Sequence, residues 1–182
     1  MTGIIPAGTH RIGVLGKSGY GKTTALRWIA AQWTQEPRPV AVYDPFPREG
    51  AWPSGCYAVD PHHLVLAMTR SAEDSRLAGL GIIIDEIGDL GRQYPELGTQ
   101  SRHYQTPVAF GGQRYSQVTP NIRHQWTVLI MFAQSPDDLK ILQAEQNLPA
   151  EVYEIADYSA YEYTCIIPAL DYFETKQIAK FV

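Results

Sequence analysis

The chain has 182 residues, of which 45% are hydrophobic and 19% charged, and its formal net charge is −4. This length suits one domain with a full core, and no apolar run approaches the ~18 residues that a membrane span requires. The negative net charge argues against indiscriminate nucleic-acid binding, although a locally basic pore stays compatible with it. We therefore expect residues 1–182 to form one globular domain.

The N-terminus and the two cysteines bear on the cellular compartment. Residues 1–8 lack the basic start and the long apolar stretch of a signal peptide. Cys56 and Cys165 are too few and too distant in sequence to build a disulfide framework or a metal site. We expect both to be buried free thiols in a reducing compartment.

Hydrophobic patterning predicts strands that alternate with helices along the chain. The expected strands are Arg11–Leu15, Val40–Asp44, Cys56–Val59, Gly81–Glu86, Pro107–Gly112 and Trp126–Phe132. The expected helices are Thr24–Trp33, His62–Thr69, Pro95–Tyr104 and Pro136–Gln146. Alternation of this kind is typical of an α/β fold with a mainly parallel sheet flanked by helices. A segment rich in Tyr, Ile and Phe, from Tyr161 to Pro168, is expected to add an antiparallel edge.

The first strand and the first helix enclose a phosphate-binding loop. Residues Gly16–Thr23 fit the pattern G-x-x-x-x-G-K-[ST], in the order strand, glycine-rich loop, helix that the motif requires. Backbone N–H groups of such a loop point at phosphate oxygens, Lys22 reaches the β- and γ-phosphates, and Thr23 ligates Mg²⁺. The residues predicted to hold the nucleotide are Gly16, Ser18, Gly19, Gly21, Lys22, Thr23 and Thr24.

A second nucleotide element ends the strand predicted at Gly81–Glu86. Its apolar run closes with Asp85 and Glu86, the two carboxylates of a Walker B pattern. Because ligands of open α/β sheets sit at strand carboxyl ends, we expect Asp85 to hold Mg²⁺ opposite Thr23. Glu86 is expected to act as the general base that polarises the attacking water.

Gln113 and Arg114 follow the strand predicted at Pro107–Gly112. A glutamine at that position suits contact with the γ-phosphate and the attacking water. The alternative, an amide that caps its own turn, is the more common situation for an isolated glutamine.

The order of these motifs resembles the FtsK–HerA superfamily of DNA-pumping ATPases. The resemblance covers roughly residues 10 to 145, and its most specific part is the spacing from Arg102 to Gln113 and Arg114. The remaining matching segments are Asn121–Arg123, Val128–Ser135 and Asp137–Leu142. Within the superfamily, the compact size resembles the genome-packaging ATPases of membrane-containing icosahedral viruses. The resemblance implies a RecA-like P-loop NTPase fold.

The resemblance also implies roles for individual residues. Gln113 becomes the sensor glutamine, and Arg102 matches the arginine finger that reaches the γ-phosphate of an adjacent subunit. Arg114 and Arg123 are rival candidates for that finger. Lys17 departs from many family members, and we expect its side chain to face solvent.

The function implied by the resemblance is ATP-driven translocation of double-stranded DNA during packaging of a viral genome. Subunits are expected to form a ring, with six favoured, and to bind ATP and Mg²⁺ at their interfaces. The segments Gly88–Tyr94 and Arg114–Thr119 are the expected DNA-facing loops, because arginine beside an aromatic residue suits phosphate contact and stacking. Capsid or virion membrane proteins are further expected partners, in the host-cell cytoplasm or the virion.

Three other functions stay open. An assembly or export ATPase of a filamentous phage or related mobile element would be expected to carry a membrane-spanning segment. A small-molecule P-loop kinase would need a lid with clustered arginines and an acceptor pocket. A nucleotide-binding switch without turnover would have no need of Glu86 beside Asp85.

Overall fold

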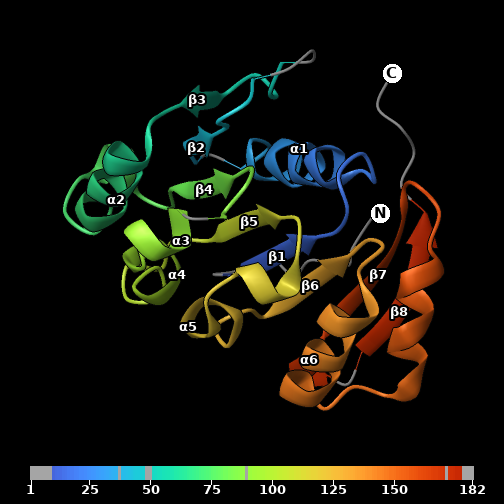
Figure 1. Ribbon diagram of the computed structural model, residues 1–182. Helices are drawn as coiled ribbons and strands as arrows, with labels where there is room; N and C mark the ends of the chain where they lie inside the picture. The colour runs from blue at the N-terminus through green and yellow to red at the C-terminus, as the bar shows by residue number, and fades with distance from the viewer. Residues whose placement is uncertain (1–9, 37, 48–50, 89, 171, 178–182) are drawn as a thin grey trace.

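The computed structural model describes residues 10–36, 38–47, 51–88, 90–170 and 172–177, and within these a single eight-stranded sheet forms the centre (Figure 1). The strands lie in the order β3-β2-β4-β5-β1-β6-β7-β8. Their bounds are β1 Arg11–Leu15, β2 Val40–Tyr43, β3 Cys56–Ala58, β4 Gly81–Ile84, β5 Val108–Gly112, β6 Val128–Met131, β7 Glu162–Ile167 and β8 Tyr172–Gln177. Strands β1 to β6 are parallel, and β7 and β8 add an antiparallel edge. The expected fold class, a mainly parallel sheet with an antiparallel C-terminal edge, is confirmed.

Helices connect the strands and cover both faces of the sheet. Their bounds are α1 Lys22–Trp33, α2 Pro61–Arg70, α3 Leu90–Gln93, α4 Glu96–Thr99, α5 Pro120–Arg123 and α6 Pro136–Gln146. Four 3₁₀ segments add η1 Ser75–Leu77, η2 Tyr115–Gln117, η3 Ala150–Asp157 and η4 Pro168–Leu170 among the described residues. The N-termini of α2 and α6 are capped by Asp60 and Ser135, whose side chains accept hydrogen bonds from backbone N–H groups of the first turn.

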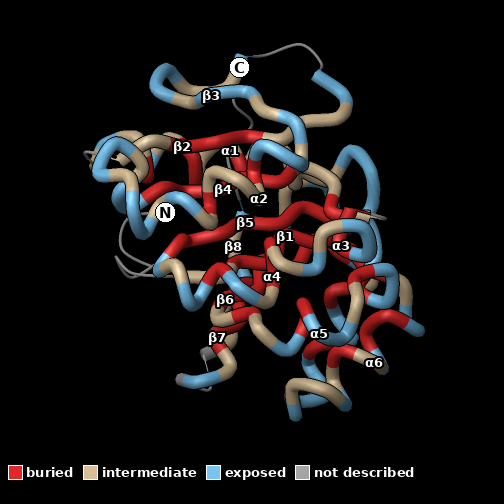
Figure 2. The backbone as a smooth tube through the Cα atoms, turned by 90° about the vertical axis from the view of Figure 1, so that its left-hand side faces the viewer, coloured by how far each residue is buried: buried red, intermediate tan, exposed pale blue. Residues whose placement is uncertain are grey.

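The core lies in two layers because successive strand residues point to opposite faces of the sheet. Ile12, Val14 and Ile83 pack with the buried side of α1 on one face. On the other face, Ile82 and Ile84 pack with residues of α2, α4, α5 and α6. In Figure 2 the buried backbone runs through the middle strands, β5 and β1 among them, and exposed segments surround it. Burial on both faces explains why the inner strands are almost wholly apolar.

The helix predicted at Pro95–Tyr104 is wrong in extent. Only Glu96–Thr99 is α-helical, and the chain continues in turns to Gln105, whose φ is 51°. A backbone bond from Thr106 N–H to the Ser101 carbonyl closes these turns. Gly98 and Thr99 are weak helix formers, so propensity gives this segment little support beyond one turn.

Smaller differences concern segment ends and the thiols. Strand β4 stops at Ile84, so Asp85 and Glu86 follow the strand rather than belong to it. Both cysteines are free, but Cys56 is only half-buried, whereas Cys165 is buried as predicted. Residues 1–9, which include the segment examined for a leader, and Asp89 of the Gly88–Tyr94 loop lie outside the described residues. Across the described ranges, the helices are too short and too polar to traverse a bilayer.

Candidate functional site

The phosphate loop forms as the sequence predicts, between β1 and α1. Gly16 is required by close approach, because a Cβ there would lie 2.5 Å from the Phe132 Cβ. Gly21 occupies the N-cap of α1 with φ 108°, a conformation that favours glycine. With no side chain at this N-cap, the first N–H groups of the twelve-residue helix face the loop. The Lys22 Nζ donates to the Lys17 carbonyl at 3.0 Å, so the amine spans the loop where phosphates bind in proteins of this kind.

A cavity of about 490 Å³ opens at the carboxyl ends of the parallel strands. Six of the predicted nucleotide-binding residues line it, together with the three catalytic or metal-site candidates that follow strands. They are Ser18, Gly19, Gly21, Lys22, Thr23, Thr24, Asp85, Glu86 and Gln113. Gly16 does not line the cavity and instead lets the loop begin against Phe132.

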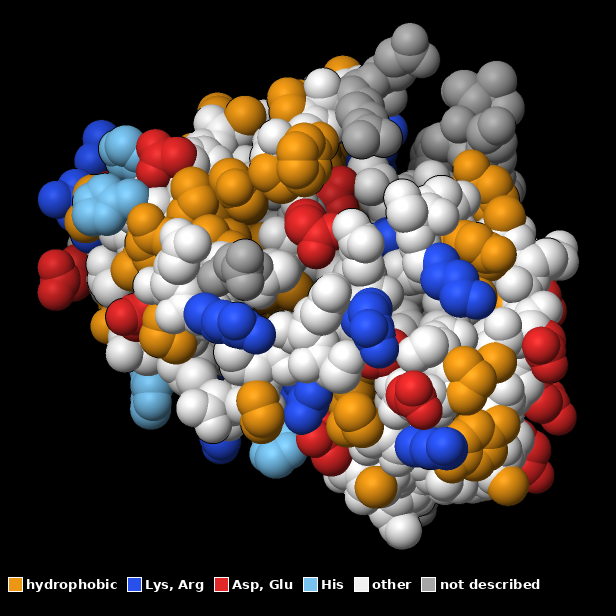
Figure 3. Space-filling view, viewed as in Figure 1, with side chains coloured by type: hydrophobic (Ala, Val, Ile, Leu, Met, Phe, Trp, Pro, Cys, Tyr) orange, Lys and Arg blue, Asp and Glu red, His pale blue; other side chains and the backbone are white. Residues whose placement is uncertain are grey.

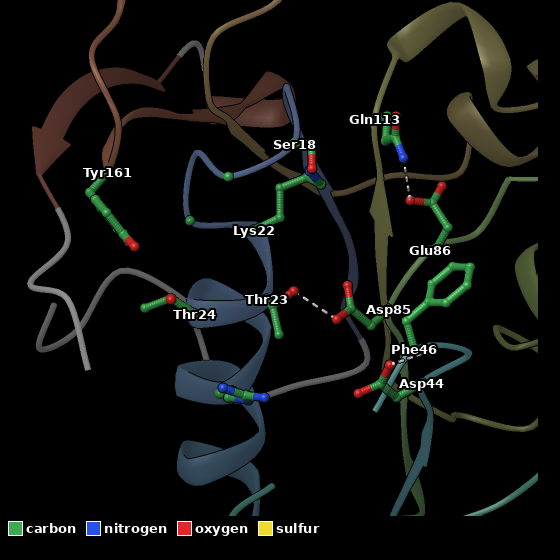
Figure 4. A pocket seen from close by; sticks show the side chains of 13 residues that line it. Ser18, Lys22, Thr23, Thr24, Asp44, Phe46, Asp85, Glu86, Gln113 and Tyr161 are labelled. Carbon is green, nitrogen blue, oxygen red and sulfur yellow. Dashed lines mark hydrogen bonds between the residues drawn. The ribbon is translucent and has the colours of Figure 1, made fainter. Parts of the chain in front are cut away.

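Thr23 and Asp85 meet across this cavity (Figure 4). The Thr23 hydroxyl donates to Asp85 Oδ2 at 2.7 Å, although the two residues are 62 positions apart. Burial raises the pKa of Asp85, and the hydrogen bond from Thr23 lowers it. The negative charge of Asp44 raises this pKa further. Burial lowers the pKa of Lys22, while Glu86 and Asp85 act in the opposite direction.

These residues fit a magnesium ion. A hydroxyl and carboxylates are the hard oxygen ligands that Mg²⁺ takes, usually with waters and substrate phosphates completing its shell. The charges of Asp44 and Glu86 oppose ionisation of Asp85, and a divalent cation at this position would offset them. When bound, the ion would neutralise phosphate charge, held by Thr23 and Asp85.

Glu86 and Gln113 also meet, at the end of the cavity beyond Asp85. The Gln113 Nε2 donates to Glu86 Oε2 at 3.3 Å. Glu86 has a φ of 92°, which is rare for a residue with a side chain and is found at functional sites. The buried Gln134 donates from Nε2 to the Gln113 carbonyl at 3.2 Å, which fixes the backbone that carries the sensor candidate.

The arginine-finger candidates lie outside the cavity of their own chain. Arg102 is exposed, and its charge acts on Arg11 at the start of β1, the strand end opposite the phosphate loop. Arg114 is half-exposed and its Nε donates to Asp138 at 2.9 Å. Arg123 is buried with an ion pair to Glu145. Arg102 therefore keeps its predicted role only in relation to another copy of the chain.

One part of the loop prediction needs correction. Tyr115, the aromatic neighbour of Arg114 in the segment Arg114–Thr119, is fully buried and donates from its hydroxyl to Glu145. It therefore has no exposed face on which a base could stack. Lys17, by contrast, is exposed as predicted.

Sequence reasoning missed four residues that line the cavity, namely Arg27, Asp44, Phe46 and Tyr161. Arg27 lies one helical turn beyond Thr23, and its guanidinium stands 5.6 Å from the ring centroid of Trp52. The Trp52 indole N–H donates to Asp44 Oδ2 at 3.1 Å. Asp44 was detectable, because it closes the strand predicted at Val40–Asp44 and ligands of open α/β sheets bind at strand carboxyl ends.

A phosphate loop that opens a helix, with its threonine bonded to the carboxylate that follows β4, two strands away from β1 in the sheet, is the arrangement of the P-loop NTPase fold. No protein-family model matches the sequence, and no curated protein matches it. Solved structures, however, share the fold. B204, the DNA-packaging ATPase from Sulfolobus Turreted Icosahedral Virus, is 14% identical with a TM-score of 0.74, over 96% of this chain and 100% of that one.

Two further structures contain nucleotide analogues. The genome-packaging NTPase B204 of Sulfolobus turreted icosahedral virus 2, in complex with ATPγS, is 14% identical with a TM-score of 0.71 and covers 92% of this chain and 96% of its own. The pCW3 conjugation coupling protein TcpA with ATPγS is 14% identical, with a TM-score of 0.62 over 93% of this chain and 60% of that protein. At such identities the likeness shows the fold, and a viral packaging ATPase is among the neighbours, as the sequence resemblance implied.

Proposed function

We propose that this protein is an ATP-hydrolysing translocase of double-stranded DNA that packages a viral genome as a ring of subunits. The observation that carries the proposal is the joint placement of Lys22, Thr23, Asp85, Glu86 and Gln113 around one cavity. The structural likeness to a viral DNA-packaging ATPase supports the choice among P-loop functions.

The residues of the cavity have distinct roles in the proposed reaction. Lys22 and the loop N–H groups bind the β- and γ-phosphates, and Thr23 with Asp85 holds Mg²⁺. Glu86 takes a proton from the attacking water as the new bond to the γ-phosphorus forms and ADP leaves. Gln113 orients that water, and its bond to Glu86 links the base to the segment Arg114–Thr119.

The position of the finger candidate supports the proposed ring. Arg102 is exposed and its charge acts on Arg11, at the end of β1 opposite the phosphate loop, so in the proposed ring it would serve the site of a neighbouring subunit. Six subunits are the number that we propose. Arginine fingers supplied in trans stabilise transition-state charge and contribute factors of about 10³ to 10⁵ in turnover.

The DNA surface is also proposed to be shared between subunits. Figure 3 shows the Lys and Arg side chains of this face scattered, with uncharged, hydrophobic and acidic surface between them. Most of the predicted loop Gly88–Tyr94 is helix α3, and Arg92 on that helix is exposed. A ring would bring several copies of Arg92 to one central channel, where DNA phosphates would need basic side chains. Capsid or virion membrane proteins would be its partners, in the host cytoplasm or the virion.

The test is the ATPase rate with and without linear double-stranded DNA, measured alongside the solution mass. We expect a Mg²⁺-dependent rate that DNA stimulates, and an oligomer larger than a dimer. Lys22→Ala and Glu86→Gln are expected to remove turnover, whereas Lys140→Ala, at an exposed lysine of α6, keeps it. Normal turnover in either of these two variants would refute the assignment of the catalytic site. A monomer whose turnover ignores DNA would refute the translocase.

A further inference from the structure

Tyr161 lies at the phosphate loop although it is about 140 residues away in the sequence. It occupies the turn before β7, and its N–H donates to the Tyr20 carbonyl at 3.0 Å. A Cβ added to Gly21 would lie 2.9 Å from the Tyr161 Cδ1, so the phenol ring rests directly on the start of α1. The ring lines the cavity and is half-buried.

The backbone holds Tyr161 in an unusual conformation. Its φ is 69°, in the left-handed region that residues with side chains rarely adopt. Such conformations persist where the surroundings enforce them, and they concentrate at ligand sites. The strained turn delivers an aromatic ring to the cavity.

The cavity has two ends that differ in chemistry (Figure 4). Asp85, Glu86 and Gln113 lie on one side of the phosphate loop, and Tyr161 lies on the other side with Thr24. The catalytic carboxylates mark the end where the γ-phosphate binds. Because a nucleoside triphosphate is a linear molecule, its ribose and base leave the loop at the end opposite the γ-phosphate, which is the Tyr161 end.

From this geometry we propose that Tyr161 is the platform on which the nucleobase stacks, in a subsite built by the turn before β7. The inference rests on the nucleotide binding in the proposed function and is independent of DNA. Stacking uses the face of the base rather than its hydrogen-bonding edge, so the subsite would discriminate little between bases and take ATP and GTP alike. Aromatic stacking of a base contributes about 1–3 kcal/mol, which corresponds to a factor of about 5 to 150 in affinity.

The experiment compares the binding of Mg²⁺–ATP, Mg²⁺–GTP and Mg²⁺–tripolyphosphate by calorimetry. Tripolyphosphate presents the phosphates without a base. Tyr161→Ala is expected to weaken both nucleotides about tenfold and to leave tripolyphosphate binding within twofold. Tyr161→Phe is expected to bind all three as the native protein does. The matched control is Tyr57→Ala, at an exposed tyrosine of β3 outside the cavity.

Four results would overturn the inference. Equal weakening of tripolyphosphate and ATP by Tyr161→Ala would show that the ring only supports the loop. A larger loss of ATP binding in Phe46→Ala, at the exposed aromatic residue near Asp44, would place the base at the other end. If the native protein binds ATP no more tightly than tripolyphosphate, the base subsite is contradicted and the proposed function is not. If the native protein binds neither compound, both the base subsite and the proposed function are overturned.

Discussion

Replacing Glu145 with alanine is expected to destabilise the protein strongly, because it leaves the buried Arg123 charge without its carboxylate. The Arg123 side chain is 8% exposed and its Nη2 lies 2.5 Å from Glu145 Oε1. Its guanidinium also stands 4.8 Å from the ring centroid of Tyr115, whose hydroxyl donates to Glu145 Oε2 at 2.8 Å. Glu145 therefore satisfies two buried groups at once.

The magnitude follows from this burial. Removing one partner of a buried ion pair costs about 3–5 kcal/mol. The Glu145 side chain is 21% exposed, so water reaches part of the pair and we expect about 3 kcal/mol, at the lower end. For a chain of this size each kcal/mol lowers the melting temperature by about 2–4 °C, which gives a drop of roughly 6–12 °C.

Thermal and urea unfolding, followed by circular dichroism and tryptophan fluorescence, measure this loss. The double variant Arg123→Met with Glu145→Leu is expected to recover most of the stability, because apolar replacements of a complete buried pair are tolerated. Turnover measured well below the melting temperature is expected to survive in the double variant. A Glu145→Ala protein within about 1 kcal/mol of the native protein would contradict the reasoning. Loss of turnover in Arg123→Met without loss of stability would make Arg123 the trans finger.

Three further predictions concern ionisation and packing. Burial raises the pKa of Asp85 in the folded state, so the stability that the protonated group contributes below its unfolded-state pKa is lost as pH rises through its folded-state pKa. Asp85→Asn should therefore increase the melting temperature of the nucleotide-free protein at neutral pH. The same variant should show a flatter pH dependence of stability on the acid side. Gly98→Ala should cost about 1–3 kcal/mol in urea unfolding, despite better helix propensity, because the added Cβ would lie 2.5 Å from the Ile122 Cγ1, and a neutral or stabilising result would refute the clash. Burial raises the pKa of Cys165 to about 11, so a thiol reagent at neutral pH should label Cys56 first and Cys165 only after unfolding, which mass spectrometry of the native and unfolded protein can check.

The nucleotide motifs were predictable from sequence because their determinants are local. The glycines of the loop, Lys22 and Thr23 sit within eight consecutive residues, and their chemistry requires that spacing. Asp85 and Glu86 follow the wholly apolar run Ile82–Ile84, so the strand and its end were both recognisable. The mainly parallel sheet followed from the alternation of apolar strands with helices.

The residues that escaped prediction depend on contacts distant in sequence. Tyr161 reaches the phosphate loop only because β7 pairs with β6, which in turn pairs with β1. The burial of Arg123 depends on Glu145, 22 residues later. A lone arginine or tyrosine carries no sign of such a partner, and assigning its role requires the strand order and the helix packing.

The charged lining of the cavity has a consequence for how turnover is controlled. Within one chain Lys22 and Arg27 face Asp44, Asp85 and Glu86, so the lining carries two cations against three carboxylates. A nucleoside triphosphate adds several negative charges to a site that is already anionic. Under the proposed function, the isolated subunit lacks positive charge for the nucleotide, which Mg²⁺ and Arg102 of a neighbouring subunit would supply. Because of this charge imbalance, we expect the specific ATPase activity to rise with protein concentration. Assembly of the subunits would then control ATP hydrolysis.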